Sequence, residues 1–127
     1  MAYLMIAVAP VPEARRAEYE RHCAAVTPLF LEHGAVRVTE CWGDSVPPGE
    51  ATSFPLAVKL EEGEVVAVSI AEWPTKEAYD AGIDGAMAAM NDAMAENPMP
   101  FDASRLIFGA FTTLLDRHSD QHSDGKG

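Results

Sequence analysis

Short apolar segments with strand character alternate with two long segments of helical periodicity, and this order limits the folds open to the chain. Residues 3–9 form an apolar run that Pro10 and Pro12 terminate, which predicts a strand with both faces covered. Residues 13–33 then carry apolar side chains three and four apart, as on one face of a helix: Tyr19, Cys23, Val26 and Phe30. Gly34 follows at a position where helices commonly end.

The rest of the chain repeats this order after a long loop. Alternation or β-branched composition predicts three more strands, over residues 35–42, 64–73 and 105–115. A helix is expected over residues 75–95, with one side formed by Tyr79, Ile83, Met87, Met90 and Met94. Residues 43–56 contain three prolines and two glycines and predict a loop of uncommon length, a kind that is often functional. Residues 57–60 predict a short edge strand.

The resulting order, β-α-β-β-α-β, predicts an α+β fold of ferredoxin-like type over residues 1–116, followed by a polar tail at 117–127. Two helices cover only one face of such a sheet. The last strand is nevertheless apolar on both sides, with Leu106, Phe108 and Leu114 against Ile107, Phe111 and Leu115. A small monomer rarely exposes that much apolar surface, so we expect a homodimer that pairs sheet against sheet.

Charge and composition exclude several classes of partner. Lys and Arg number 9 against 20 Asp and Glu, giving a net charge of −11 with His neutral, which repels nucleic acid. Phe108 and Phe111 are three apart and point to opposite faces of a strand, unlike the stacking pair of an RNA-recognition motif. No segment approaches the ~20 apolar residues of a membrane span, and two cysteines are too few for a disulfide framework. We expect a cytoplasmic protein with reduced thiols and without nucleic-acid or membrane partners.

Two stretches carry long and specific patterns, ECWGDSVPPGEATSFP at residues 40–55 and MPFDASRLIFGAF at residues 99–111. They resemble the YbaA-like family of uncharacterised bacterial proteins over nearly all of the chain before the tail. That family is similar to the dimeric α/β-barrel superfamily, which includes cofactor-free monooxygenases, stress-induced proteins and heme-handling enzymes. The resemblance implies a ferredoxin-like dimeric α/β barrel and no particular activity. Trp42 and Ser45 depart from the common pattern, and Ser45 leaves Asp44 without an acidic neighbour for a metal.

Three carboxylates lie closest to the loops in these stretches: Glu40, Asp44 and Asp102. One of them could act as a general base or anchor a polar ligand at the mouth of the barrel. The alternative is turn chemistry, in which Asp44 and Asp102 accept backbone N–H bonds. Arg105 could bind a carboxylate-bearing ligand, or it could form an ion pair with Asp102 or with a partner's carboxylate.

Several side chains in the same stretches are candidates to line a ligand pocket, since such sites are mainly apolar with few polar groups: Trp42, Ser53, Phe54 and Phe101. Alternatively, both loops anchor themselves and the partner subunit. His22 and Cys23 are adjacent, so on a helix they point about 100° apart and do not form a nucleophile–base pair. His118 and His122 have i, i+4 spacing, but they lie in the tail. We therefore expect neither a metal nor a cofactor.

Three functions remain open from the sequence. The first is a dimeric protein that binds a small molecule between sheet and helices or at the dimer seam. The second is a cofactor-independent oxygenase or isomerase for an aromatic or quinone-like substrate, with Trp42, Phe54 and Phe101 against its rings and a carboxylate or His33 moving protons. The third is a stress-related interaction module without a small ligand. The sequence leaves open whether the protein is an enzyme.

Overall fold

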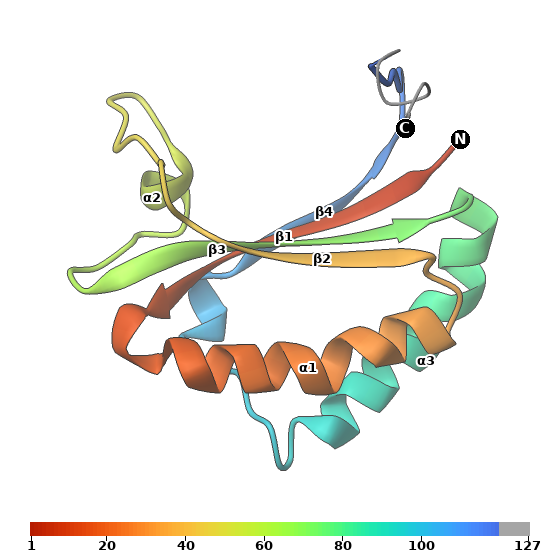
Figure 1. Cartoon of the computed structure of the whole chain (residues 1–127), viewed down its shortest axis with the longest axis horizontal. Coiled ribbons are helices and arrows are strands. Elements are labelled where there is room, and N and C mark those ends of the chain that lie inside the picture. The colour runs from red at the N-terminus through yellow and green to blue at the C-terminus, as the bar shows by residue number, and fades with distance from the viewer. Residues whose placement is uncertain (120–127) are drawn as a thin grey trace.

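The structure is a computed structural model that describes residues 1–119. Four strands form one antiparallel sheet in the order β2-β3-β1-β4: β1 (Tyr3–Pro12), β2 (Arg37–Trp42), β3 (Glu64–Trp73) and β4 (Ile107–Thr112). Two long helices, α1 (Arg16–Glu32) and α3 (Lys76–Ala93), lie across one face of this sheet (Figure 1). The order and the layers are those of the ferredoxin-like α+β fold, which confirms the fold class predicted from the sequence.

β1 is the central strand, because it pairs with β3 along its whole length and with β4 along its first part. Successive side chains point to opposite faces. Ala9 and Val11 pack with Tyr19 of α1 on the face that the helices cover, whereas Val8 packs with Val58 and Val66 on the other face. Neither α1 nor α3 covers this second face, which is here called the free face (Figure 1).

The helices are fixed to the sheet most firmly at the end where α1 stops. Trp73 at the end of β3 is completely buried in a cluster with Phe30, Ala35 and Ala86. Tyr79 meets the Trp73 ring edge-on with a centroid distance of 5.4 Å. A buried aromatic side chain of this kind contributes roughly 1.5–3 kcal/mol from burial alone. This cluster therefore sets the distance between α3 and the sheet.

The start of α3 and the end of α1 each have a local cause. The Thr75 hydroxyl accepts the Ala78 backbone N–H at 3.0 Å and so begins α3. α1 continues through Pro28, although a proline inside a helix removes one backbone hydrogen bond. At its end the Nδ1–H of His33 donates to the Leu29 carbonyl at 2.8 Å, which satisfies one of the last carbonyls of the helix.

An arm formed by residues 43–60 projects from the free face, on the side opposite the helices (Figure 1). The predicted edge strand at residues 57–60 is wrong, because the short helix α2 (Phe54–Ala57) occupies the start of this range. The Ser53 hydroxyl accepts the Leu56 N–H at 3.0 Å, and Pro55 stands in the first turn, where proline favours a helix. Val58 then returns to the sheet and is completely buried.

The last strand is shorter than the sequence predicted. Two short 3₁₀ helices flank the core elements, η1 (Glu13–Arg15) before α1 and η2 (Ala103–Arg105) before β4. η2 begins at Asp102, whose carboxylate accepts the Ser104 N–H at 3.0 Å, so Arg105 belongs to this turn and not to the strand. Leu114 and Leu115 lie beyond β4 and are exposed. The predicted polar tail lies largely outside the described residues.

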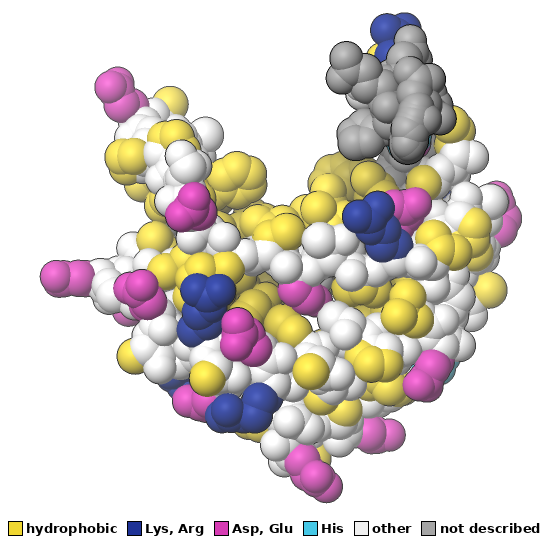
Figure 2. Space-filling model, viewed as in Figure 1, with side chains coloured by type: hydrophobic (Ala, Val, Ile, Leu, Met, Phe, Trp, Pro, Cys, Tyr) yellow, Lys and Arg dark blue, Asp and Glu magenta, His cyan; other side chains and the backbone are white. Residues whose placement is uncertain are grey.

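Two surface features bear on partners. Hydrophobic side chains gather over the free face beside the arm (Figure 2). They include Phe54 and Leu56 from the arm and Ile107 and Phe111 from β4, each between 44% and 53% exposed. Within residues 1–119, no helix combines the length and the apolar character that a membrane crossing requires.

Gly82 allows α3 to approach the end of α1. A Cβ atom at this position would overlap the carbonyl oxygen of His33 and would lie 3.1 Å from the Trp73 ring. Gly85, one turn later, faces only the His33 ring, and a Cβ atom there would lie 2.7 Å from the Cδ2 atom of that ring. Gly82 is thus required for this close packing, whereas a side chain at position 85 would meet only a ring that can move.

We predict that Gly82→Ala lowers the free energy of unfolding by about 1–3 kcal/mol, the usual cost of overpacking. Helix propensity alone would stabilise the protein by up to about 1 kcal/mol, so the sign of the change identifies the steric cause. Urea unfolding measures it. Gly85→Ala is the matched variant and should lower the free energy of unfolding less, because the His33 ring can turn away from the new methyl group whereas a backbone carbonyl cannot. A more stable Gly82→Ala protein would contradict this packing.

Candidate ligand-binding site

A cavity of about 320 Å³ lies between the sheet and the two long helices. Its floor is formed by small side chains on the helix-covered face of β1 and β3: Ala7, Ala9, Ala67 and Ser69. Larger side chains on α1, α3 and residues 99–106 form the walls, among them Phe30, Met87, Met90 and Phe101. Bulky side chains at the two ends of the sheet hold the helices away from it. The small side chains between these ends are too short to fill the resulting gap. The space, here called the ligand cavity, is large enough for a small molecule.

Glu40 is the carboxylate in the wall of the ligand cavity. It lies on β2 directly opposite Ser69 of β3, whose hydroxyl donates to Glu40 Oε2 at 3.1 Å. Tyr19 and Cys23, one turn apart on α1, line the same cavity walls as this carboxylate, and their phenol and thiol groups act to lower its pKa. Glu40 is thus surrounded by three neutral donors that come from two different elements.

Burial sets the protonation of this cluster. Removal from water raises the pKa of Glu40, and the hydrogen bonds from Ser69, Cys23 and Tyr19 offset part of that rise. Burial, reinforced by the neighbouring Glu40 charge, raises the pKa of the Cys23 thiol to about 12. Burial likewise raises the pKa of Tyr19 far above its usual range. Cys23 and Tyr19 therefore remain protonated at neutral pH, where they serve as donors and not as nucleophiles.

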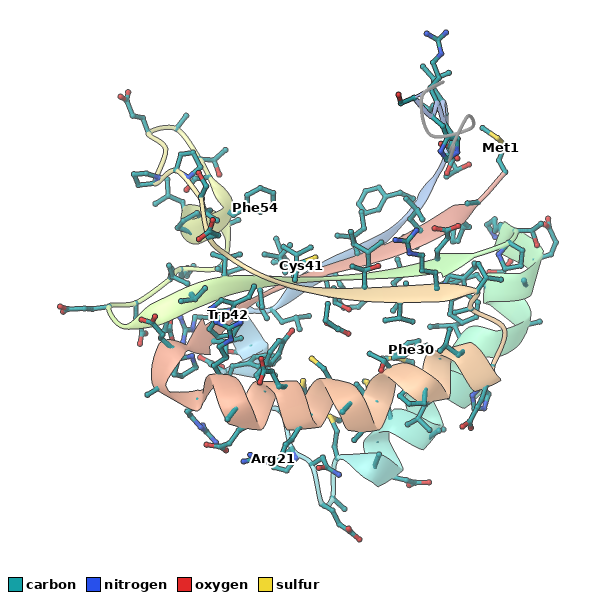
Figure 3. The ribbon with its side chains drawn as sticks, in the orientation of Figure 1. Met1, Arg21, Phe30, Cys41, Trp42 and Phe54 are labelled. Carbon is teal, nitrogen blue, oxygen red and sulfur yellow. The ribbon has the colours of Figure 1, made fainter. Side chains whose placement is uncertain are left out.

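A second, more open cavity of about 200 Å³ adjoins the first. The two cavities share Tyr19, Cys23 and Glu40 in their walls. The outer cavity adds Trp42, and the Arg16 guanidinium lies over the Trp42 ring at 5.2 Å from its centroid. Figure 3 shows Trp42 and Phe30 between the sheet and the helices. The Glu40 cluster thus stands between an apolar interior and a polar opening.

Aromatic rings surround Tyr19. Its ring centroid lies 5.9 Å from that of Trp42 and 6.2 Å from that of Phe101. The buried His22 ring stacks on Tyr19 at 6.3 Å, and its Nδ1–H donates to the Asn97 carbonyl at 2.9 Å. This bond holds the segment after α3 against α1, so it helps to position Phe101 at the cavity.

The residues predicted from the sequence separate into two groups. Glu40, Trp42 and Phe101 come together around Tyr19 at the two cavities. Asp44 is exposed after β2, Ser53 caps α2, and Phe54 lies on the arm on the other side of the sheet (Figure 3). These three residues do not contribute to either cavity wall.

Arg105 and Asp102 hold the cavity-lining segment in place. The Arg105 guanidinium donates to both oxygens of Glu64 at 2.8 and 2.7 Å, to Asp102 at 3.1 Å and to the Lys59 carbonyl at 2.9 Å. The side chains of Arg105 and Glu64 are only 14% and 9% exposed. These bonds lower the pKa of Glu64, and those from Ser104 and Arg105 lower the pKa of Asp102. The arrangement is an ion-pair network that joins η2 to β3.

Sequence reasoning missed Tyr19, Cys23 and Ser69 as members of the site. Tyr19 and Cys23 do lie on the apolar side of α1, as predicted, but that side faces Glu40 as well as hydrocarbon. One signal was available in the sequence. Glu40 lies two residues after Val38 on β2, so this carboxylate points to the same, helix-facing side of the strand as an apolar side chain. Among residues 1–119, no three His, Cys, Asp or Glu side chains gather as a group that could hold a metal ion.

The fold and the cavity define a ferredoxin-like α+β protein whose sheet and helices enclose a ligand-sized space. The chain belongs to the DUF1428 family, described as proteins of unknown function, whose sequence model matches residues 2–103. The uncharacterised protein YbaA of Escherichia coli K12 is 40% identical over 116 residues, 91% of this chain and 99% of that protein. The predicted family resemblance is confirmed.

Solved structures with much lower identity share the fold. A dimeric ferredoxin-like protein of unknown function from Jannaschia sp. CCS1 is 15% identical, with a TM-score of 0.55 over 87% of this chain and 99% of that one. A monooxygenase of Streptomyces coelicolor in complex with nanaomycin D is 16% identical, with a TM-score of 0.55 over 94% and 93% of the two chains. At this identity the likeness shows the fold alone.

We predict that the free energy of unfolding of the wild type, relative to that of Glu40→Gln, falls as the pH rises. A carboxyl group with a raised pKa stabilises the folded state while it is protonated. That contribution is present below its ordinary pKa of 4.5 and is lost as the pH rises through the raised value. Urea unfolding at a series of pH values measures the difference. Glu77→Gln, which changes the same charge on exposed α3, is the control. A difference that stays constant with pH, or that moves the other way, would contradict the burial of Glu40.

Proposed function

We propose that this protein binds a small, mainly apolar molecule in the ligand cavity, with Glu40 and its neighbours holding the polar group of that molecule. The observation that carries the proposal is one carboxylate, ringed by Ser69, Tyr19 and Cys23, in an otherwise largely apolar cavity. Ligand sites of proteins combine apolar walls with a few placed polar groups in this way. Trp42 and Phe101 add aromatic surface next to the carboxylate.

A second candidate is a cofactor-independent oxygenase or isomerase for an aromatic substrate. The raised pKa of Glu40 favours it, because a carboxylate whose pKa moves toward neutrality is a better general base. The Streptomyces coelicolor monooxygenase shares the fold, which fits this candidate without favouring it over binding alone. Oxygen uptake with a panel of hydroquinones separates the two candidates.

We also propose that the protein is a homodimer that joins two free faces into a dimeric α/β barrel. Ile107 and Phe111 of β4 and Phe54 and Leu56 of the arm expose apolar surface on this side. The arm projects from the same side and would reach around a second copy (Figure 1). The Jannaschia protein with this fold is described as dimeric, which supports the same arrangement.

A cytoplasmic location without a nucleic-acid partner fits two further properties. Cys23 and Cys41 are free thiols, as expected in a reducing compartment. The net charge of −11 opposes binding to polyanions.

We predict that the neutral dye N-phenyl-1-naphthylamine, which fluoresces in apolar surroundings, binds the protein saturably. Ala7→Phe places a phenyl ring in the floor of the ligand cavity and should weaken dye binding at least tenfold. Ala24→Phe makes the same substitution at an exposed position of α1 and should leave binding unchanged. Fluorescence titration measures both, after circular dichroism has shown that the variants fold. Equal dye binding by wild type and Ala7→Phe would place the dye elsewhere and contradict the proposed site.

We predict that sedimentation at micromolar concentration gives twice the chain mass of 13.7 kDa. Phe111→Lys should convert the protein to a monomer, because an ammonium group without a partner is costly to bury between two sheets. Leu31→Lys is the matched control at a similarly exposed position, 48% against 53%, on α1. A wild-type monomer, or a dimer that Phe111→Lys leaves intact, would exclude pairing through the free face.

A further inference from the structure

We propose that the molecule in the ligand cavity is an organic cation, an amine or ammonium group on an apolar body, whose charge is held by Glu40 among the rings of Tyr19, Trp42 and Phe101. This inference rests on the proposed binding function and names the class of ligand that the site selects.

Glu40 lacks a counter-charge among the residues that line the ligand cavity. The groups around it are neutral: the Ser69 hydroxyl, which donates to it at 3.1 Å, and the nearby phenol of Tyr19 and thiol of Cys23. Within residues 1–119, no Lys or Arg lines the ligand cavity and no ion pair includes Glu40. Carboxylates removed from water are normally paired with a cation, as Glu64 is with Arg105. A cationic ligand would supply the charge that the chain itself does not place there.

Aromatic side chains line the two cavities together with Glu40. The face of an aromatic ring attracts cations, most strongly for Trp. Trp42 and Phe101 flank Tyr19 with centroid distances of 5.9 and 6.2 Å. A guanidinium, that of Arg16, already lies over the Trp42 ring at 5.2 Å in the outer cavity. This cluster therefore accepts a positive charge at one of its rings in the protein as it stands.

The charge and the walls of the cavity also disfavour other classes of ligand. An anion in the ligand cavity would meet the Glu40 charge, and no Lys or Arg of residues 1–119 lines that cavity to receive it, since Arg16 lines only the outer cavity. The net charge of −11 also opposes its approach. A neutral molecule would leave the carboxylate unpaired. The walls beyond Glu40 are mainly apolar, with Met87, Met90 and Phe30 among them, so the remainder of the ligand is hydrocarbon or aromatic. His22 also lines the cavity and can carry a positive charge, but its Nδ1–H already donates to the Asn97 carbonyl.

A matched series of probes tests the inference by displacement of N-phenyl-1-naphthylamine and by calorimetry at neutral pH: 4-phenylbutylamine, 4-phenylbutanol and 4-phenylbutyrate. The expected order of affinity is amine, then alcohol, then carboxylate, with the amine at least tenfold tighter than the alcohol. Glu40→Gln should remove the preference for the amine and change the affinity for the alcohol less than threefold. Glu77→Gln, with the same change of net charge outside the cavity wall, should keep the wild-type order.

The possible failures are distinguishable. If the alcohol binds as tightly as the amine, or if the preference survives Glu40→Gln, the cation inference is wrong while cavity binding stands. If neither the dye nor any of the three probes binds, the proposed function fails and the inference with it. Should Glu40→Gln not fold, the wild-type order still decides. Trp42→Leu then provides the second variant and should lower the affinity for the amine more than that for the alcohol.

Discussion

The helices rest on bulky side chains at both ends of the sheet and cross a centre built from small ones. Trp73 and Phe30 set the spacing at one end, and Tyr19 packs on Val11 at the other. Between these supports the helix-facing positions of β1 and β3 carry alanine and serine, so the two layers cannot close. The ligand cavity, the burial of Glu40 and the approach of α1 all depend on this difference in side-chain size.

Within that space Glu40 is half-buried, and among residues 1–119 no ion pair includes it. Three hydrogen-bond donors reduce the cost of its charge, but burial still raises its pKa. Arg105 illustrates the contrast, because it pairs with Glu64 and Asp102, whereas Glu40 forms no such pair within residues 1–119. Arg105 and its partner carboxylates thus fix the cavity-lining segment. The carboxylate of Glu40 instead lies in the wall of the cavity, where a ligand would bind. A carboxylate with a raised pKa in a cavity is a candidate functional position, which is the basis of the proposed site.

The sequence predicted the element order and the fold class, because strand and helix periodicities differ and the helix boundaries are clear. It failed at residues 57–60, where the Ser53 cap and Pro55 favour a helical turn over a strand. Of the residues that the sequence singled out, Glu40, Trp42 and Phe101 lie together around Tyr19, and their part in binding stays a prediction. Tyr19 and Cys23 were missed because periodicity counts a phenol and a thiol simply as apolar. Their position opposite Glu40 depends on how α1 crosses the sheet, which no local pattern contains.

A crystal structure of the full chain grown with N-phenyl-1-naphthylamine tests the central claim most directly, since it locates the ligand instead of reporting its affinity. The account predicts density for the dye between the floor of β1 and β3 and the helices α1 and α3, next to Glu40. Dye bound only on the free face or at the seam between two copies, with the space under the sheet closed by side chains, would contradict it.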